Sequence, residues 1–241
     1  MRGYGKIGGI GKRMIRLLIY DLDGTLIDSR RDIANAVNWT LEEMGFSALP
    51  QERVQCFVGS GVRNLMEDSL RESGAFPDGE KTPELSKLAD RAIQLFRRRY
   101  GNHLLEETRL YPSVMKVLET FRDRRQAVIT NKPEDFSLTI LEGLGIRNHF
   151  FSVLGGDAGF PKKPAPEGAR ELLRRAGVSA EEALLIGDSA IDVETGRNAG
   201  IATMAVTYGF GKRKEIEAAS PHYLIDDLEE IFRCPLLKEI R

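Results

Sequence analysis

Two carboxylates, Asp21 and Asp23, stand two residues apart at the end of an apolar segment and are followed by Gly24 and Thr25. Side chains two apart at the end of a strand lean to the same side, so both carboxylates can face one substrate. We expect Asp21 to attack phosphorus as a nucleophile, and Asp23 to protonate the leaving alcohol and then activate water. Gly24 permits a sharp turn that brings its amide to a phosphate, and Thr25 adds a hydroxyl and an amide.

An anionic nucleophile that approaches a phosphate dianion needs nearby cations. Two like unit charges at ~4 Å repel each other by about 4 kcal/mol at an effective dielectric constant of roughly 20. We expect Asp188 to join Asp21 in binding Mg²⁺, which prefers oxygen ligands. We expect Lys163 to place an ammonium beside the phosphate and the nucleophile. Lys163 is preferred to the neighbouring Lys162 because it directly precedes a proline.

A hydroxyl and an amide, those of Thr130 and Asn131, follow another apolar segment and are expected to bind the remaining phosphate oxygens. Each feature also has a simple structural interpretation. Thr130 and Asn131 suit a strand end and a helix cap, Lys163 suits a loop, and Asp188 with Asp192 suits a turn and a helix cap. Their occurrence together, in order and each after a predicted strand or loop, favours a phosphoryl-transfer site.

Apolar runs typical of buried strands precede most of these residues. They span residues 15–20, 126–130, 151–155, 183–187 and 201–206. From about residue 108 onward they alternate with segments whose apolar residues recur at helical spacing. The alternation predicts an α/β fold with a doubly wound parallel sheet, in which ligands gather at the carboxyl ends of the strands. Residues 223–231 predict a last short strand and a closing helix.

Residues 29–106 have helical spacing and no convincing strand, as in Ile33, Val37 and Leu41. We therefore expect an all-helical insertion that begins just after the first strand and its polar loop. Such an insertion should lie over the site as a cap that opens and closes. The expected organisation is a flexible leader of residues 1–13, a catalytic core of residues 14–28 and 107–241, and a cap of residues 29–106.

The composition argues against several classes of partner. The 241 residues contain 35 Lys and Arg against 36 Asp and Glu, so no overall field draws the chain to nucleic acid or to an anionic membrane. No apolar run approaches the ~18 residues of a spanning helix. Cys56 and Cys234 are the only cysteines, lie far apart and lack metal-ligand spacing, so we expect no disulfide framework and a reducing cytoplasm as the location. Gly3, Gly5 and Gly8 match a dinucleotide-binding glycine pattern, but no strand precedes them to aim the loop.

Together these segments resemble the haloacid dehalogenase-like superfamily of aspartate phosphatases, over the chain from Met14 onward. The four family motifs correspond to residues 21–29, 130–132, 163–166 and 187–192. The resemblance implies a Rossmann-like core in which Mg²⁺ is held by the Asp21 carboxylate, the Asp23 backbone carbonyl and Asp188. It also implies that Asp192 supports the metal from nearby.

The helical insertion resembles the first cap type of this superfamily, and the overall layout is most similar to the phosphoglycolate phosphatase group. The segment 59–63, Gly-Ser-Gly-Val-Arg, resembles the substrate-facing cap loop of that group. This similarity implies substrate contacts by Gly61 and Arg63. The alternative is a glycine-rich connection between two helices.

The activity expected from these features is Mg²⁺-dependent hydrolysis of a small phosphate monoester, with phosphoglycolate as the best candidate. A sugar phosphomutase shares every catalytic residue and differs in the acceptor of the phosphoryl group, and a pyrophosphatase on the same scaffold also remains open. A hydrolytic dehalogenase neither needs nor tolerates the metal-binding second carboxylate, so Asp23 and Asp188 argue against it. A non-catalytic phosphate-binding protein should have lost a charged catalytic position, and this chain has not. The sequence leaves monomer and homodimer open.

Overall fold

A computed structural model describes residues 14–75 and 83–237 of the chain. The expected leader and its glycine pattern lie outside the described residues. The chain divides into two compact units, the first comprising residues up to 28 together with 110–241 and the second comprising residues 29–109.

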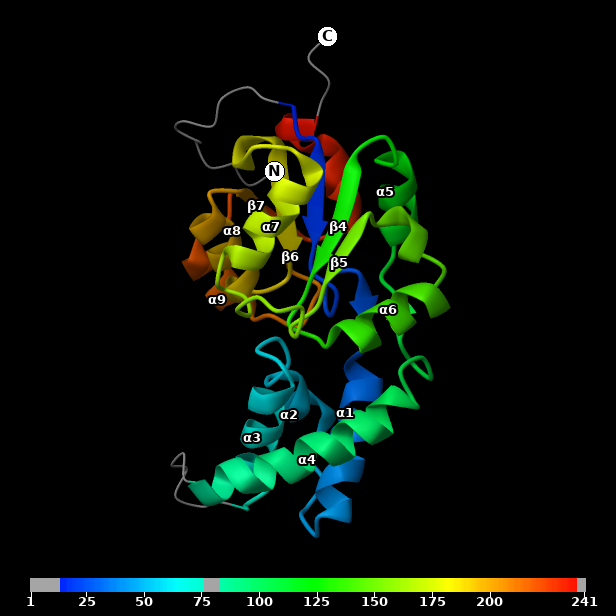
Figure 1. The fold of residues 1–241 in the computed structure, drawn as a ribbon, viewed down its shortest axis with the longest axis vertical. Coiled ribbons are helices and arrows are strands. Elements are labelled where there is room, and N and C mark those ends of the chain that lie inside the picture. Colours follow the sequence, from blue (N-terminus) through cyan, green and yellow to red (C-terminus); the bar gives the residue numbers. More distant parts are fainter. Residues whose placement is uncertain (1–13, 76–82, 238–241) are drawn as a thin grey trace. The chain divides into compact units, whose positions relative to one another are not determined.

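The first unit is built on a six-stranded sheet in the order β5-β4-β1-β6-β7-β8 (Figure 1). The strands are β1 (Leu17–Tyr20), β4 (Arg125–Ile129), β5 (Ser152–Leu154), β6 (Ala183–Gly187), β7 (Ala202–Val206) and β8 (Tyr223–Ile225). All neighbouring pairs are parallel, and Tyr20 of β1 lies opposite Val128 of β4 and Ile186 of β6. The expected α/β fold with a parallel sheet is confirmed.

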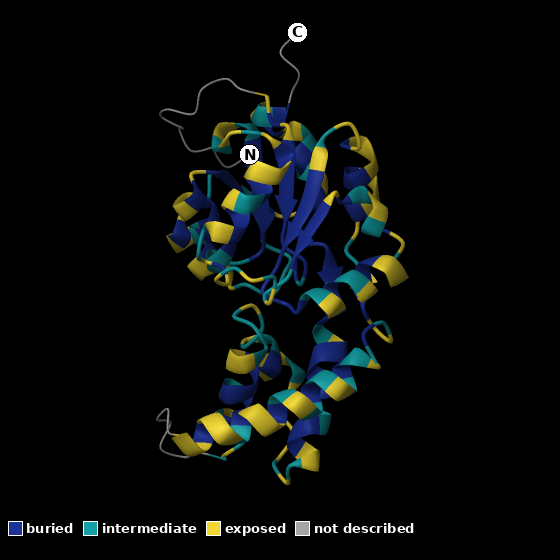
Figure 2. Cartoon of the chain, in the orientation of Figure 1, coloured by how far each residue is buried: buried dark blue, intermediate teal, exposed yellow. Residues whose placement is uncertain are grey.

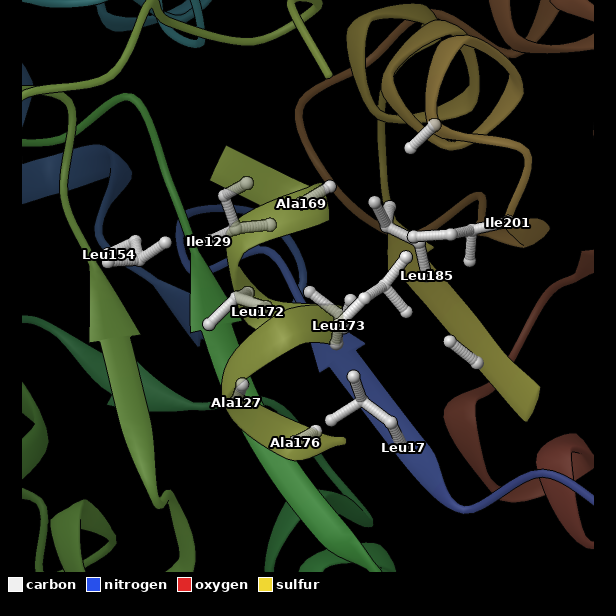
Figure 3. Close-up of a cluster of buried hydrophobic side chains, with 13 residues drawn as sticks. Leu17, Ala127, Ile129, Leu154, Ala169, Leu172, Leu173, Ala176, Leu185 and Ile201 are labelled. Carbon is white, nitrogen blue, oxygen red and sulfur yellow. The ribbon is translucent and has the colours of Figure 1, made fainter. Parts of the chain in front are cut away.

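Helices flank this sheet and bury its apolar side chains. They are α5 (Val114–Thr120), α6 (Glu134–Gly143), α7 (Glu167–Ala176), α8 (Ala190–Ala199) and α9 (Arg213–Ala219), with 3₁₀ turns η1 (Arg147–His149), η2 (Ala180–Glu182), η3 (Leu228–Arg233) and η4 (Pro235–Leu237). Figure 3 shows Leu172 of α7 packed with Ile129 of β4 and Leu17 of β1 in one buried cluster. Each fully buried leucine contributes about 1.5–3 kcal/mol, so this cluster holds the strand ends in place.

Two features of the fold differ from the sequence-based expectation. The expected closing helix is the 3₁₀ segment η3, and the carboxylate of Asp227 accepts a hydrogen bond from the backbone amide of Glu229 at its start. A separate two-stranded sheet pairs β2 (Ile27–Asp28) with β3 (Arg109–Leu110). Strands of two residues are too short to show an alternating pattern.

The second unit is helical, and its helices are α1 (Arg30–Glu43), α2 (Gln51–Gln55), α3 (Val62–Glu72) and α4 (Pro83–Gly101). The buried residues of α4 follow helical spacing, and Figure 2 shows the exposed positions alternating with them along the helix. The five-residue α2 was not expected. Both cysteines are free, Cys56 being exposed and Cys234 buried. Within the described ranges, no helix combines the length and apolar character needed to cross a bilayer.

Candidate active site

Asp21 follows β1 directly, and its backbone amide donates to the carbonyl of Ile186 on β6 at 2.9 Å. The chain then turns sharply, because the Leu22 carbonyl accepts bonds from three backbone amides, those of residues 25, 26 and 27. Gly24 has a left-handed backbone with φ of +85°, and a Cβ there would lie 2.2 Å from Oδ2 of Asp188. Only glycine meets both conditions, so this turn is built for close approach to Asp188.

Lys163 joins two of the predicted site carboxylates. Its Nζ lies 2.8 Å from Oδ1 of Asp21 and 2.6 Å from Oδ1 of Asp192, and its side chain is 3% exposed. Burial disfavours the ammonium, but the charges of Asp192 and Asp21 outweigh it and raise the pKa of Lys163. The cation therefore stays charged beside Asp21. The neighbouring Lys162 is exposed.

Asn131 binds the main chain of this lysine. Its Nδ2 donates to the Lys163 carbonyl at 3.1 Å, and its Oδ1 accepts from the Lys163 amide at 2.9 Å. Asn131 was expected to bind phosphate, and both polar atoms of its side chain instead contact the backbone of Lys163. Thr130 lines a small pocket together with Asn131 and Lys163, and its Oγ1 accepts a bond from the Lys132 amide at 3.2 Å.

Three buried carboxylates gather beside Lys163. Asp21, Asp188 and Asp192 each offer an oxygen, and these atoms lie within 4.8 Å of one another. Burial raises the pKa of Asp21 to about 7, although the charge of Lys163 opposes the shift. Burial, with the added repulsion of Asp192 and Asp21, raises the pKa of Asp188 to about 8. A divalent cation would relieve the repulsion among these carboxylates. Their oxygen atoms are hard ligands, which suit Mg²⁺.

Asp192 serves two structural roles at once. Its Oδ1 accepts from Lys163, and its Oδ2 accepts from the Ser189 amide at 3.1 Å and hydroxyl at 2.6 Å, which closes a capping box at the start of α8. The simple interpretation as a helix cap is therefore confirmed, and the role of Asp192 beside a metal stays a prediction. Since both oxygens are engaged, Asp192 is better placed to support the cluster than to bind an ion directly.

Thr25 is fully buried, and its Oγ1 donates to Oδ1 of Asp188 at 3.3 Å. The expected contact of Thr25 with a substrate phosphate stays a prediction. The other oxygen of Asp188 accepts from the backbone amides of Phe210 at 2.6 Å and Gly211 at 3.2 Å. Asp188 is therefore positioned by two segments that are distant in the sequence.

Lys132 was given no role from the sequence, although it lies in the second motif. Its Nζ donates to Oδ1 and Oδ2 of Asp23 at 2.8 and 3.0 Å, and the two side chains are 5% and 12% exposed. A lysine that follows a strand carries no signal of this contact, because its partner is 109 residues away. Asp23 is thus oriented by a buried ammonium.

Gly61 and Arg63 belong to the second unit. Gly61 precedes α3 with φ of +95°. Within α3, Nη2 of Arg63 lies 2.5 Å from Oδ1 of Asp90, and its Nη1 lies 3.7 Å from Oε1 of Glu67. The guanidinium is therefore held by two carboxylates on an exposed part of this unit.

Residues 18–206 match the family model of haloacid dehalogenase-like hydrolases. The chain belongs to this family. The family expected from the motifs is therefore confirmed, and the chain is similar over most of its length to several relatives. The phosphoglycolate phosphatase of Vibrio parahaemolyticus is 36% identical over 220 residues, which cover 90% of this chain and 94% of that protein. The phosphoglycolate phosphatase of Aquifex aeolicus is 34% identical over 200 residues, covering 82% of this chain and 87% of that protein.

A solved structure supports the same assignment. The crystal structure of a predicted phosphoglycolate phosphatase from Haemophilus somnus superimposes with a TM-score of 0.84 at 29% identity, covering 93% of this chain and 99% of that one. The similarity in sequence and in fold therefore extends over both units of this chain.

Proposed function

We propose that this chain is a Mg²⁺-dependent phosphatase that hydrolyses a small phosphate monoester, with phosphoglycolate as the best candidate substrate. The observation that carries the proposal is the buried contact of Lys163 with Asp21 and Asp192, beside the carboxylate of Asp188. The names of the relatives from Vibrio parahaemolyticus and Aquifex aeolicus support the choice of substrate.

In the first half-reaction, an oxygen of Asp21 attacks phosphorus and the bond from phosphorus to the ester oxygen breaks. Asp23 gives its proton to the departing oxygen, which leaves as an alcohol. Lys163 offsets the repulsion between the nucleophile and the phosphate because its ammonium is already in contact with Asp21. Lys132 holds the Asp23 carboxyl group in position for this proton transfer.

In the second half-reaction, water attacks the phosphorus of the aspartyl phosphate and gives a proton to the Asp23 carboxylate. The bond from Asp21 to phosphorus breaks, inorganic phosphate leaves, and both carboxyl groups return to their starting states. Asp21, Asp188 and the backbone carbonyl of Asp23 would hold Mg²⁺, which neutralises charge on the phosphate. Asp192 would support this site through Lys163 and Ser189.

The helical second unit is proposed as the cap that selects the substrate, with contacts from Gly61 and Arg63. This unit is one continuous segment inserted between residues 28 and 110 of the first unit, which supports this role. The proposed partner is a small phosphorylated metabolite.

The test is phosphate release from a panel that includes phosphoglycolate, sugar phosphates, nucleotides and pyrophosphate, with Mg²⁺ and with EDTA. We expect the highest kcat/KM for phosphoglycolate and no turnover in EDTA. Asp21→Asn should lower kcat by at least about 10³-fold while the circular dichroism spectrum is retained. Retained turnover in that variant would exclude Asp21 as the nucleophile. Transfer of the phosphoryl group to a sugar hydroxyl in the product analysis would instead indicate the phosphomutase alternative.

A further inference from the structure

The segment Tyr208–Gly211, which follows β7, encloses the side chain of Asp188. Two consecutive backbone amides, those of Phe210 and Gly211, donate to Oδ2 of Asp188 at 2.6 and 3.2 Å. Backbone amides are rigid donors, because their direction is set by the fold and not by a rotamer. This oxygen of Asp188 is therefore fixed by the main chain of a loop that is 22 residues away in the sequence.

Two glycines make this approach feasible. A Cβ at Gly209 would lie 2.4 Å from both Cβ and Oδ2 of Asp188, and a Cβ at Gly211 would lie 2.1 Å from the Asp188 carbonyl oxygen. Unlike Gly24, neither glycine has a left-handed backbone, so their φ angles do not require glycine. The requirement is one of space, because any side chain there would displace Asp188.

Tyr208 closes the contact on the other side of the carboxylate. Its hydroxyl donates to the Thr25 carbonyl at 2.7 Å, and the hydroxyl of Thr25 donates to Oδ1 of Asp188 at 3.3 Å. The ring of Tyr208 packs against Tyr111, with 4.5 Å between the ring centroids. Burial, with nearby Asp188, raises the pKa of Tyr208, which keeps the phenol a donor. The turn after β1 and the loop after β7 are thus tied together around Asp188.

We propose that Tyr208–Gly211, the Asp188 clamp, positions this carboxylate for Mg²⁺ and makes the site selective for Mg²⁺ over Ca²⁺. The clamp engages Oδ2 with two amides and leaves Oδ1, with one longer bond, as the oxygen for the cation. Mg²⁺ demands near-ideal octahedral geometry at ~2.0–2.1 Å, whereas Ca²⁺ accepts variable geometry at ~2.3–2.6 Å. A carboxylate held in one orientation therefore favours the smaller ion. This inference rests on the proposed metal dependence.

The experiment measures Mg²⁺ and Ca²⁺ binding to the full chain by titration calorimetry after EDTA treatment and dialysis. In Tyr208→Phe and Gly209→Ala, we expect the Kd for Mg²⁺ to rise about 10-fold or more, as is usual when an outer-shell partner is lost. The Kd for Ca²⁺ should rise less, so the preference for Mg²⁺ shrinks. Because Tyr208→Phe removes one hydroxyl and no packing, it carries the test if Gly209→Ala fails to fold.

Two variants control for the loss of a neighbouring phenol hydroxyl and for the loss of stability. Tyr111→Phe keeps the ring that packs on Tyr208, and Gly145→Ala strains a backbone with φ of +72° whose Cβ would meet nothing within 4 Å. Both should keep the wild-type Kd for Mg²⁺. An unchanged Mg²⁺ affinity in the clamp variants, or equal losses for the two cations, would overturn the proposal. A further outcome is that the clamp variants lose the Mg²⁺ preference of the wild-type chain while the wild-type chain releases no phosphate from the substrate panel. That result would overturn the proposed function and support the role of the clamp.

Discussion

Nζ of Lys132 lies between the two carboxylate oxygens of Asp23, at 2.8 and 3.0 Å. Both side chains are almost entirely buried, so loss of the lysine leaves a carboxylate without its main counter-charge. Breaking such a pair by removing one partner costs about 3–5 kcal/mol, because the remaining charge stays in a poorly solvated place. The pair therefore affects stability as well as the orientation of the proposed acid and base.

Lys132→Met should lower the free energy of unfolding by about 3 kcal/mol. It should also lower kcat at least 10-fold, in a range of about 10–10³, because Asp23 loses its fixed orientation. Urea denaturation and phosphate release measure the two effects. The double variant Lys132→Met/Asp23→Asn should recover much of the stability and none of the turnover, which separates the structural from the catalytic contribution.

Lys116→Met is the matched control, since Lys116 is paired with Glu229 at an exposed site. An exposed ion pair contributes roughly 0–1 kcal/mol, so this variant should unfold and turn over much as the wild type does. If Lys132→Met behaved like Lys116→Met in both measurements, Lys132 would have no positioning role.

The sequence predicts which residues lie at the strand ends of this site. It does not predict which of their side chains contact one another. Apolar runs that stop at Asp21 and Asp188 locate two carboxylates at one edge of a parallel sheet, since their period and length predict buried strands. Which donor meets which carboxylate depends on chain segments far apart, as for Lys132 with Asp23, 109 residues away. Asn131 illustrates the same limit, because a local pattern cannot show that its amide binds the backbone of Lys163.

The raised pKa values of Asp21, about 7, and Asp188, about 8, predict a pH dependence of the metal-free chain. Both carboxyls titrate near pH 4 when unfolded. From about pH 4 up to those values the folded chain holds more protons than the unfolded chain, so its stability falls as pH rises. In EDTA, we expect a lower melting temperature at pH 8 than at pH 6. Asp188→Asn should reduce this difference, because one of the titrating groups is gone.

Binding of Mg²⁺ at pH 7 should release protons, because ionised carboxylates are the ligands. Titration calorimetry in two buffers with different ionisation enthalpies measures this release. The proton release should diminish in Asp188→Asn, and Mg²⁺ should stabilise the wild-type chain more at pH 8 than at pH 6. Mg²⁺ affinity that does not change with pH would contradict the raised pKa values of Asp21 and Asp188.

Arg63 is predicted to act on substrate preference more than on the chemical step. Arg63→Met should lower kcat/KM for phosphoglycolate by about 10-fold, as expected for loss of a charged substrate contact worth about 1.4 kcal/mol. Its kcat on p-nitrophenyl phosphate should stay near the wild-type value. Arg53→Met is a close match, because Arg53 is also half-exposed in the same unit and pairs with Glu72. Equal losses on both substrates in Arg63→Met, or the same loss of preference in Arg53→Met, would exclude a specificity role.

Asp32 should be among the most important polar residues for the stability of the second unit. Its buried carboxylate accepts from the amides of Glu107, at 3.0 Å to each oxygen, and Thr108 at 2.8 Å, and from the Thr108 hydroxyl at 2.7 Å. These bonds join the start of α1 to the segment after α4. Asp32→Ala leaves buried donors without an acceptor, each costing about 1–3 kcal/mol.

We therefore expect Asp32→Ala to destabilise the chain by about 2–4 kcal/mol, and Thr108→Val, which removes one of the bonds, by about 1 kcal/mol. Asp32→Asn should also be destabilising, because the NH₂ group of asparagine is a donor and would face the amides of Glu107 and Thr108, which are donors too. Amide hydrogen exchange at Glu107 and Thr108 reports directly on this contact, whereas denaturation of a chain with two units mixes their contributions. Protection of both amides should be lost in Asp32→Ala and retained in Thr108→Val. Protection that survives in Asp32→Ala would mean that the surrounding backbone, and not this carboxylate, holds the two segments together.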